Sequence, residues 1–366
     1  MSTSHASQKA GSAPRPLLEK LGVGLLLLLA LTSLFVDWQL TWMPALAAVL
    51  VLCSARTNVI LLAIATSTLL LVGGAVTTYR VGMAVPDWPA TMGQNMFTYP
   101  LADMLEAGWG VTLEHGHRLW ASLVGLVTLG VAYRAVRERA PWRRTALAAV
   151  VVVCMQGLLG GTRVLENSQD LAFLHGSFAQ IFYGFVFTLL VISSRSWARA
   201  AARPSEHARG LRSLALAATA CVYAQIVLGA WLRHSGLTGA LLLHVTLAFL
   251  VVALVLGLAA RLRAAAGEDL ASPLLTVRRL LLGALTAQVL LGFLATAAIF
   301  LISQGFQGQV SWPEAVSATL HVGVGAVLLG STVAANLWTR RLLAQDSPAP
   351  AAGQQGAGAL GAEAAL

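Results

Sequence analysis

Charged side chains are scarce in this 366-residue chain, where Lys, Arg, Asp and Glu together make up 11% of the residues. Soluble globular proteins carry roughly 25%. Hydrophobic residues reach 57%, so too few polar side chains remain to cover a surface in water, and an ordinary soluble domain is excluded. The same apolar content excludes a wholly disordered chain, and the 34 glycines follow no period, which excludes a collagen-like repeat. The composition therefore indicates a polytopic membrane protein.

Cysteine is also rare. Cys53, Cys154 and Cys221 each lie inside an apolar run and show no pair spacing. They predict neither a disulfide framework nor a zinc site. The formal net charge of +9 does not indicate a nucleic-acid partner here, because basic residues in a membrane protein set its orientation.

Long apolar runs are what the sequence has in abundance. A helix needs about 20 apolar residues to cross the hydrocarbon core. Ten candidate runs occur, at 18–36, 40–54, 59–78, 112–134, 144–163, 171–193, 212–232, 240–260, 278–300 and 315–338. The second run is short enough to be a short span or half of a re-entrant hairpin. The first follows a basic start, as a signal sequence does, but it is long and no small-residue cleavage site follows, so we expect a retained helix. The predicted fold class is an all-α integral membrane protein.

The basic residues predict the orientation. With residues 1–17 placed in the cytoplasm, 20 of the 24 Lys and Arg fall on the cytoplasmic side, as the positive-inside rule requires. An even number of spans places both termini inside, with 345–366 as a disordered tail. We expect a multi-pass protein of a bacterial plasma membrane. Four arginines break the pattern and lie at outer ends of spans: Arg80, Arg118, Arg163 and Arg233.

A short phrase recurs toward the outer ends of three runs. Gln-x-x-Leu-Gly occurs at 156–160, 225–229 and 288–292, and the run at 59–78 contains Gly73-Gly74. The recurrence predicts two related four-helix halves, 59–195 and 212–340, preceded by a transmembrane hairpin at 18–54. The function of the added hairpin is left open.

Ionisable residues inside a membrane are costly and are candidates for function. Four histidines lie about 6–10 Å below the outer surface, judged from helical rise: His117, His175, His244 and His321. Two imidazoles from facing helices can ligate one haem iron, so one pair per half predicts two haem sites. The alternative is that each is a core histidine bonded to a backbone carbonyl. Zinc is disfavoured because no cysteine or carboxylate cluster accompanies the pairs.

Other polar residues cluster near these histidines. Glu114 precedes His117 by three residues on the same helix face, where it can move protons or can serve as a helix-start carboxylate. His115 points away from His117 and is expected at the lipid or a helix interface. The four outer arginines are suited to haem propionates, with interfacial snorkelling as the alternative.

The outer loop from 79 to 111 is too long for a simple connector. It contains Pro86-Asp87-Trp88-Pro89, in which two prolines stiffen the backbone around a tryptophan suited to packing on a flat ligand. The loop is expected either to cover the first site or to act as a structural cap.

These residues together resemble the haem A synthase family. The resemblance rests on Gly73-Gly74 with Arg80, on Pro86-Asp87-Trp88-Pro89, on Glu114-His115-Gly116-His117-Arg118, on Gly160-Gly161-Thr162-Arg163 and on the three later histidines. It covers about residues 59–340.

The resemblance implies two pseudo-symmetric four-helix bundles and an oxidoreductase. It implies haem O as substrate at His117 and His175, with Glu114 as the essential acid, and a haem b cofactor at His244 and His321. The reaction oxidises the C8 methyl of haem O to the formyl group of haem A, for terminal oxidases. Implied partners are haem O and haem A, haem O synthase (a protohaem farnesyltransferase), an unknown electron donor and membrane lipid. A homo-oligomer is compatible with the resemblance.

The chain departs from many bacterial relatives at one point, because its outer loop contains no cysteine and Val85 precedes the Pro-Asp-Trp-Pro run. This is similar to the cysteine-free branch of the family. Two other readings of the paired histidines stay open: a di-haem b-type cytochrome that only transfers electrons, and a haem transporter or chaperone. The roles of His115 and His234 are also left open.

Overall fold

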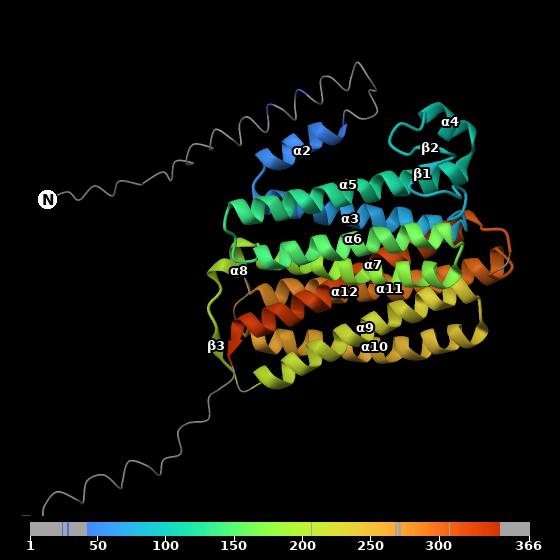
Figure 1. Ribbon diagram of the computed structural model, residues 1–366. Helices are drawn as coiled ribbons and strands as arrows, with labels where there is room; N and C mark the ends of the chain where they lie inside the picture. The colour runs from blue at the N-terminus through green and yellow to red at the C-terminus, as the bar shows by residue number, and fades with distance from the viewer. Residues whose placement is uncertain are drawn as a thin grey trace, which may run out of the picture. The chain divides into compact units, whose positions relative to one another are not determined.

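The computed structural model describes residues 42–205, 207–267, 269, 272–306 and 308–344, together with Gly24 and Leu28. This part of the chain is an all-α integral membrane protein (Figure 1). Within it, eight helices are long and apolar enough to cross a membrane. Their bounds are α3 Ala55–Thr78, α5 Trp109–Arg137, α6 Arg143–Leu165, α7 Gln169–Ile192, α9 Ala208–Ser235, α10 Thr238–Ala266, α11 Pro273–Ala297 with its π-helical end Ala298–Ile302, and α12 Trp312–Leu342.

These eight helices confirm the third to tenth predicted runs. The second run forms α2, Trp42–Leu52, whose 11 residues are too few to cross the hydrocarbon core as a helix. The first run, 18–36, lies outside the described residues apart from Gly24 and Leu28, as do 1–17 and 345–366.

Local sequence signals fix several helix ends. Ser54 and Ser168 are N-cap residues, and their hydroxyls accept hydrogen bonds from the backbone N–H groups of Thr57 and Leu171. Such a cap satisfies a backbone donor that the first helical turn leaves without a partner. α9 ends at Gly236, which adopts a left-handed conformation with φ of 63° that glycine adopts at little cost.

The structure divides into two compact units. The first comprises the described residues up to Ser193 together with Leu294–Gly323. In it α3 packs on α5 and α7, and α6 packs on α5 and α7, so the four helices form a closed bundle, while α2 packs on α5. The core contains small and branched side chains from all five helices, among them Leu50, Leu62, Val127, Ala149 and Val186.

The 79–111 segment folds over one end of this bundle, which we call the loop end. It contains a two-stranded antiparallel hairpin, β1 Ala90–Thr91 and β2 Gln94–Asn95, and a short helix, α4 Leu101–Glu106, which packs on α5. Val85, Tyr99 and Val111 form a small buried cluster beneath it. The segment is therefore a folded cap with its own core.

The second unit comprises Ser194–Phe293 and the described residues from Val324 onward. It contains α9 packed on α10, the short helix α8 Arg195–Arg199, and a parallel pair of two-residue strands, β3 Arg203–Pro204 and β4 Leu343–Ala344. Trp197 meets Trp338 edge-on at 5.2 Å between ring centroids. α11 and α12 each contribute residues to both units.

Candidate functional site

A cavity of about 650 Å³ lies in the first unit, where α5, α6 and α7 meet the loop-end cap. This volume is within the range of about 300–1,000 Å³ that small-molecule and cofactor sites occupy. The lining is largely apolar and small, with a few polar groups that matter for chemistry: Glu114, His117, Arg118, Arg163 and His175. The predicted residues of the first site are thus brought together by three helices that pack side by side.

His117 and His175 reach this cavity from α5 and α7, and each ring lies against a glycine of a neighbouring helix. A Cβ atom on Gly73 would be 3.0 Å from His117 Cε1, and one on Gly160 would be 2.7 Å from His175 Cε1. Real Cβ atoms make such approaches rarely or never, so alanine at either position would displace the imidazole. The two glycines therefore set where the imidazoles sit.

Gln156 holds His175 from the adjacent helix. Its Nε2 donates to the backbone carbonyl of His175 at 3.1 Å and lies 3.2 Å from Nδ1 of the same residue. Oε1 of Gln156 is buried and has no hydrogen-bond partner in the described part of the chain, and the same is true of Nδ1 of His117. Unpaired buried polar atoms cost free energy, so both atoms mark a site that fits a polar or metal-bearing ligand.

Glu114 is 1% exposed and its two carboxylate oxygens have different partners. Oε2 accepts the backbone N–H of Val85 at 2.8 Å, and Oε1 accepts from Arg118 Nη2 at 3.0 Å. α5 begins at Trp109, so Glu114 stands beyond its first turn. The helix-start interpretation of this carboxylate is therefore wrong, because the macrodipole acts within the first turn.

Arg118 is 8% exposed and ties the cap to α5. Nη1 donates to the carbonyls of Asp87 and Ala90 at 2.6 and 3.1 Å, and Nη2 donates to the carbonyl of Val85 at 2.6 Å as well as to Glu114. Snorkelling toward an interface is excluded for this side chain. Its guanidinium is engaged by loop carbonyls, so its main role is to hold the cap over the cavity.

Arg163 is the second guanidinium at the cavity. Its Nη2 donates to the carbonyl of Gly82 at 2.9 Å and lies 3.8 Å from Oε1 of Glu114. A Cβ on Gly82 would come within 2.9 Å of Nη1. The cap backbone therefore runs close against Arg163, which brings this guanidinium to the cavity beside the carboxylate.

The Pro-Asp-Trp-Pro run contributes two side chains in different ways. Trp88 lines the cavity, and a Cβ on Gly161 would be 2.5 Å from its ring, so this position must be glycine for the indole to lie there. The Asp87 carboxylate accepts the backbone N–H groups of Met92 and Gly93 at 3.0 and 2.8 Å. Burial on its own raises the pKa of Asp87, but these backbone donors outweigh it and hold the pKa below its usual value.

Three other predicted residues lie elsewhere. Arg80 and Arg233 are not among the residues that line this cavity: Arg80 donates to the carbonyl of Phe306, and Arg233 lies in the last turn of α9 in the second unit. His115 was expected at the lipid or a helix interface, and a lipid-facing position is wrong. It is 2% exposed beneath the cap, with Nδ1 3.0 Å from Thr91 Oγ1 and its ring edge-on to Tyr99 at 5.4 Å. The cap therefore buries His115, although His115 points away from His117 on α5.

The second unit repeats the histidine arrangement. A Cβ on Gly229 would be 3.0 Å from His244 Cε1, and Nε2 of Gln225 donates to the His244 carbonyl at 2.8 Å. His321 lies in the part of α12 that belongs to the first unit. Among the described residues, no group of three or more His, Cys, Asp or Glu side chains is arranged to hold a metal ion by itself.

Sequence reasoning missed the roles of Gln156 and Gly161 and the presence of Cys154 in the cavity lining. For the glutamine a signal existed, since Gln156 and His175 are 19 residues apart and Gln225 and His244 have the same separation. For Cys154 there was no such signal, because one thiol in an apolar run looks like any other buried small residue.

Comparison with known proteins agrees with the geometry. The family model described as cytochrome oxidase assembly protein (COX15-CtaA) matches residues 56–241, just over half of the chain. The chain belongs to this family. The matched region contains every residue of the cavity and ends three residues before His244.

Two curated proteins are similar to part of this chain. A protein of Symbiobacterium thermophilum named "Heme A synthase" is 30% identical over 158 residues, which are 41% of this chain and 49% of that protein. One of the same name from Halalkalibacterium halodurans is 28% identical over 159 residues, again 41% and 49%. The chain spans about half the length of the curated relatives it matches. No solved structure matches the chain.

Proposed function

We propose that this chain is a haem A synthase, which binds haem O between His117 and His175 and oxidises its C8 methyl group to the formyl group of haem A. The observation that carries the proposal is the cavity, where two histidines from different helices share one space with a buried carboxylate and a guanidinium. Family membership and the printed name of the relatives support it.

The two histidines are the ligands of the substrate iron. Neutral imidazoles from two helices of a bundle are suited to axial ligation. Gly73 and Gly160 fix both rings by close approach, so the ligand geometry is set before the haem enters. Gln156 orients His175, which is the role that partners of metal-ligating histidines commonly have.

Arg163 and Glu114 act together at one edge of the porphyrin. In haem O the C8 methyl shares its pyrrole ring with a propionate, so the group that holds this propionate also sets where the methyl lies. Arg163 is the anchor for the propionate, and its Nη2 lies 3.8 Å from Glu114 Oε1. With the propionate held at Arg163, the C8 methyl comes close to the Glu114 carboxylate. This carboxylate can accept or return a proton as the methyl carbon is oxidised.

The reaction replaces two methyl hydrogens by one oxygen, through successive hydroxylations and loss of water. It is a four-electron oxidation of the carbon, for which dioxygen serves as the terminal oxidant. Trp88 and other residues of the cap line the cavity, where they shield the reacting edge from water. Arg118 holds the cap closed through its bonds to three loop carbonyls. The chain's own residues thus bind, orient and protect the substrate.

A haem b cofactor, for which the family resemblance implies His244 and His321 as ligands, would supply electron transfer. The residues around His244 fit such a group, because Gly229 and Gln225 hold its imidazole as Gly160 and Gln156 hold that of His175. The proposal also includes haem O synthase as the source of the substrate and an unknown electron donor. It places the chain in a bacterial plasma membrane with both termini in the cytoplasm, and it includes self-association.

The test is co-expression of the full chain with a haem O synthase in a host that makes no haem A, followed by extraction and chromatography of the haems. The proposal predicts haem A in aerobic cells. A folded, haem-loaded chain that leaves only haem O would overturn it, and would favour a di-haem cytochrome or a haem transporter.

A further inference from the structure

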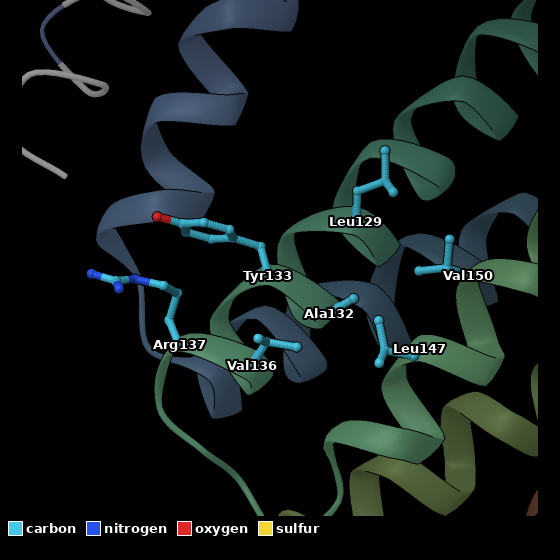
Figure 2. A pocket seen from close by; sticks show the side chains of 7 residues that line it. All are labelled: Leu129, Ala132, Tyr133, Val136, Arg137, Leu147 and Val150. Atoms are coloured by element: carbon cyan, nitrogen blue, oxygen red, sulfur yellow. The ribbon is translucent and has the colours of Figure 1, made fainter. Parts of the chain in front are cut away.

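A second cavity of about 400 Å³ lies on the first unit between α5 and α6 (Figure 2). We call it the α5–α6 groove. In Figure 2, Leu147 and Val150 on α6 gather around the same space as Leu129 and Ala132 on α5. The remaining lining residues are Tyr133, Val136 and Arg137. The groove is therefore a hydrocarbon surface along most of its length, with polar groups toward one end.

The α5–α6 groove continues the haem cavity. Leu129 and Val150 line both spaces. Along α5, His117 and Leu129 are separated by about 18 Å of helical rise, and Val136 lies about 10 Å further on. The two spaces thus follow one another along the same pair of helices, away from the loop end.

The orientation of the porphyrin decides what enters the groove. Propionates held at Arg163 point toward the loop end, so the opposite edge of the ring points along α5 toward Leu129. In haem O this opposite edge carries the long isoprenoid tail. A tail attached to the ring at this edge can run along α5 to Leu129, where the groove begins.

Resting on the proposed function, we propose that the α5–α6 groove binds the isoprenoid tail of the substrate haem and thereby selects haem O over a tail-less haem. A phospholipid acyl chain has the same hydrocarbon chemistry. The structure favours the tail, because the groove and the haem cavity share Leu129 and Val150 in their linings, so a chain tethered to the haem can reach the groove along α5. Leu129, Val136 and Leu147 are 52%, 46% and 49% exposed, which leaves ample apolar surface for such a chain to cover.

The test compares two haems on the purified full chain in detergent micelles. Haem O and haem B, which lacks the tail, are titrated separately and their binding is followed by absorbance. The parent chain should prefer haem O by at least about tenfold, a preference that burial of only two methylene groups would supply. Leu147→Trp, at a residue that lines the groove and not the haem cavity, should remove this preference while haem B affinity stays within about twofold.

Two further variants test whether the loss of preference is specific to the groove. Val151→Trp is the matched control, since Val151 follows Val150, is 60% exposed and lines neither cavity; it should keep the preference. Val136→Trp, at a second residue that lines only the groove, should lower the preference without changing haem B binding.

The outcomes separate the tail site from the proposed function. A Leu147→Trp chain that keeps the full preference would overturn the inference and would favour a lipid acyl chain as the occupant of the groove. Equal affinities of the parent chain for haem O and haem B would also overturn it, while the haem site itself would stand. Equal weakening of both haems by Leu147→Trp would contradict a tail site. Failure of the parent chain to bind either haem would defeat the proposed function as well.

Discussion

His117 in the first unit and His244 in the second are held in the same way, but the residues beside them differ. In each case a Cβ on a neighbouring glycine would lie 3.0 Å from Cε1 of the ring. Glu114 and Arg118 flank His117 on α5, whereas Leu241 and Val245 occupy the corresponding positions around His244 on α10. Glycines therefore position the imidazole in both units, whereas a carboxylate that can exchange a proton lies beside His117 and not at the corresponding position near His244.

The largest expected effect is the loss of haem A formation on substitution of Glu114, without loss of bound haem O. Glu114→Gln keeps the shape of the side chain but removes its ability to exchange a proton, so haem A formation should fall by at least about 100-fold while haem O stays bound. The measurement is haem extraction and chromatography after co-expression with haem O synthase, with Leu241→Ala as the matched substitution on α10. Product formation by Glu114→Gln at the parent rate would remove Glu114 from the mechanism.

The glycines should give the next largest effect, each at its own histidine. Gly73→Val should lower haem affinity at the first site by at least about tenfold, and Gly229→Val should do so only at the second, because each new side chain collides with one imidazole. Haem-to-protein ratios and absorption spectra of the purified variants report which haem is lost. Gly116→Val serves as control, since nothing lies within 4 Å of a Cβ at that position. Loss of both haems from either variant would contradict independent sites.

Gln156 and Gln225 make equivalent bonds and should show equivalent, smaller effects. Replacing either by leucine removes a hydrogen bond to the carbonyl of a proposed ligand, worth about 1 kcal/mol, or roughly fivefold in affinity. The midpoint potential of the haem bound at the same histidine should shift, which a general loss of packing would not produce selectively. Identical potentials in the parent chain and both variants would show that these glutamines do not tune the ligands.

The smallest effect concerns the Asp87 carboxylate in the cap and its response to pH. Its folded-state pKa lies below the unfolded value of about 3.9, so its stabilisation of the cap is complete above that value and is lost as the pH falls through the folded-state pKa. Tryptophan fluorescence should report loosening around Trp88 in acid, and Asp87→Asn should remove this step. An unchanged acid transition in Asp87→Asn would assign it to another group.

The helices were predictable because the apolar runs and their basic flanks are strong signals, and eight runs became helices within a few residues of the predicted bounds. Gathering of His117, His175 and Glu114 at one cavity was also predictable, since helical rise sets the depth of each residue. The cap was not, because the bonds of Arg118 to loop carbonyls depend on how the loop folds back over α5. His115 was misplaced for the same reason, since helical periodicity shows only which way a side chain points and not whether a loop covers it.

The central claim is that His117 and His175 together hold the substrate haem, and the most direct measurement is the absorption and electron paramagnetic resonance spectrum of the purified full chain titrated with haem O. The account predicts a low-spin, bis-histidine iron that is lost in both His117→Ala and His175→Ala and retained in His244→Ala. Retention of the bis-histidine signal for added haem O in both first-unit variants would contradict it.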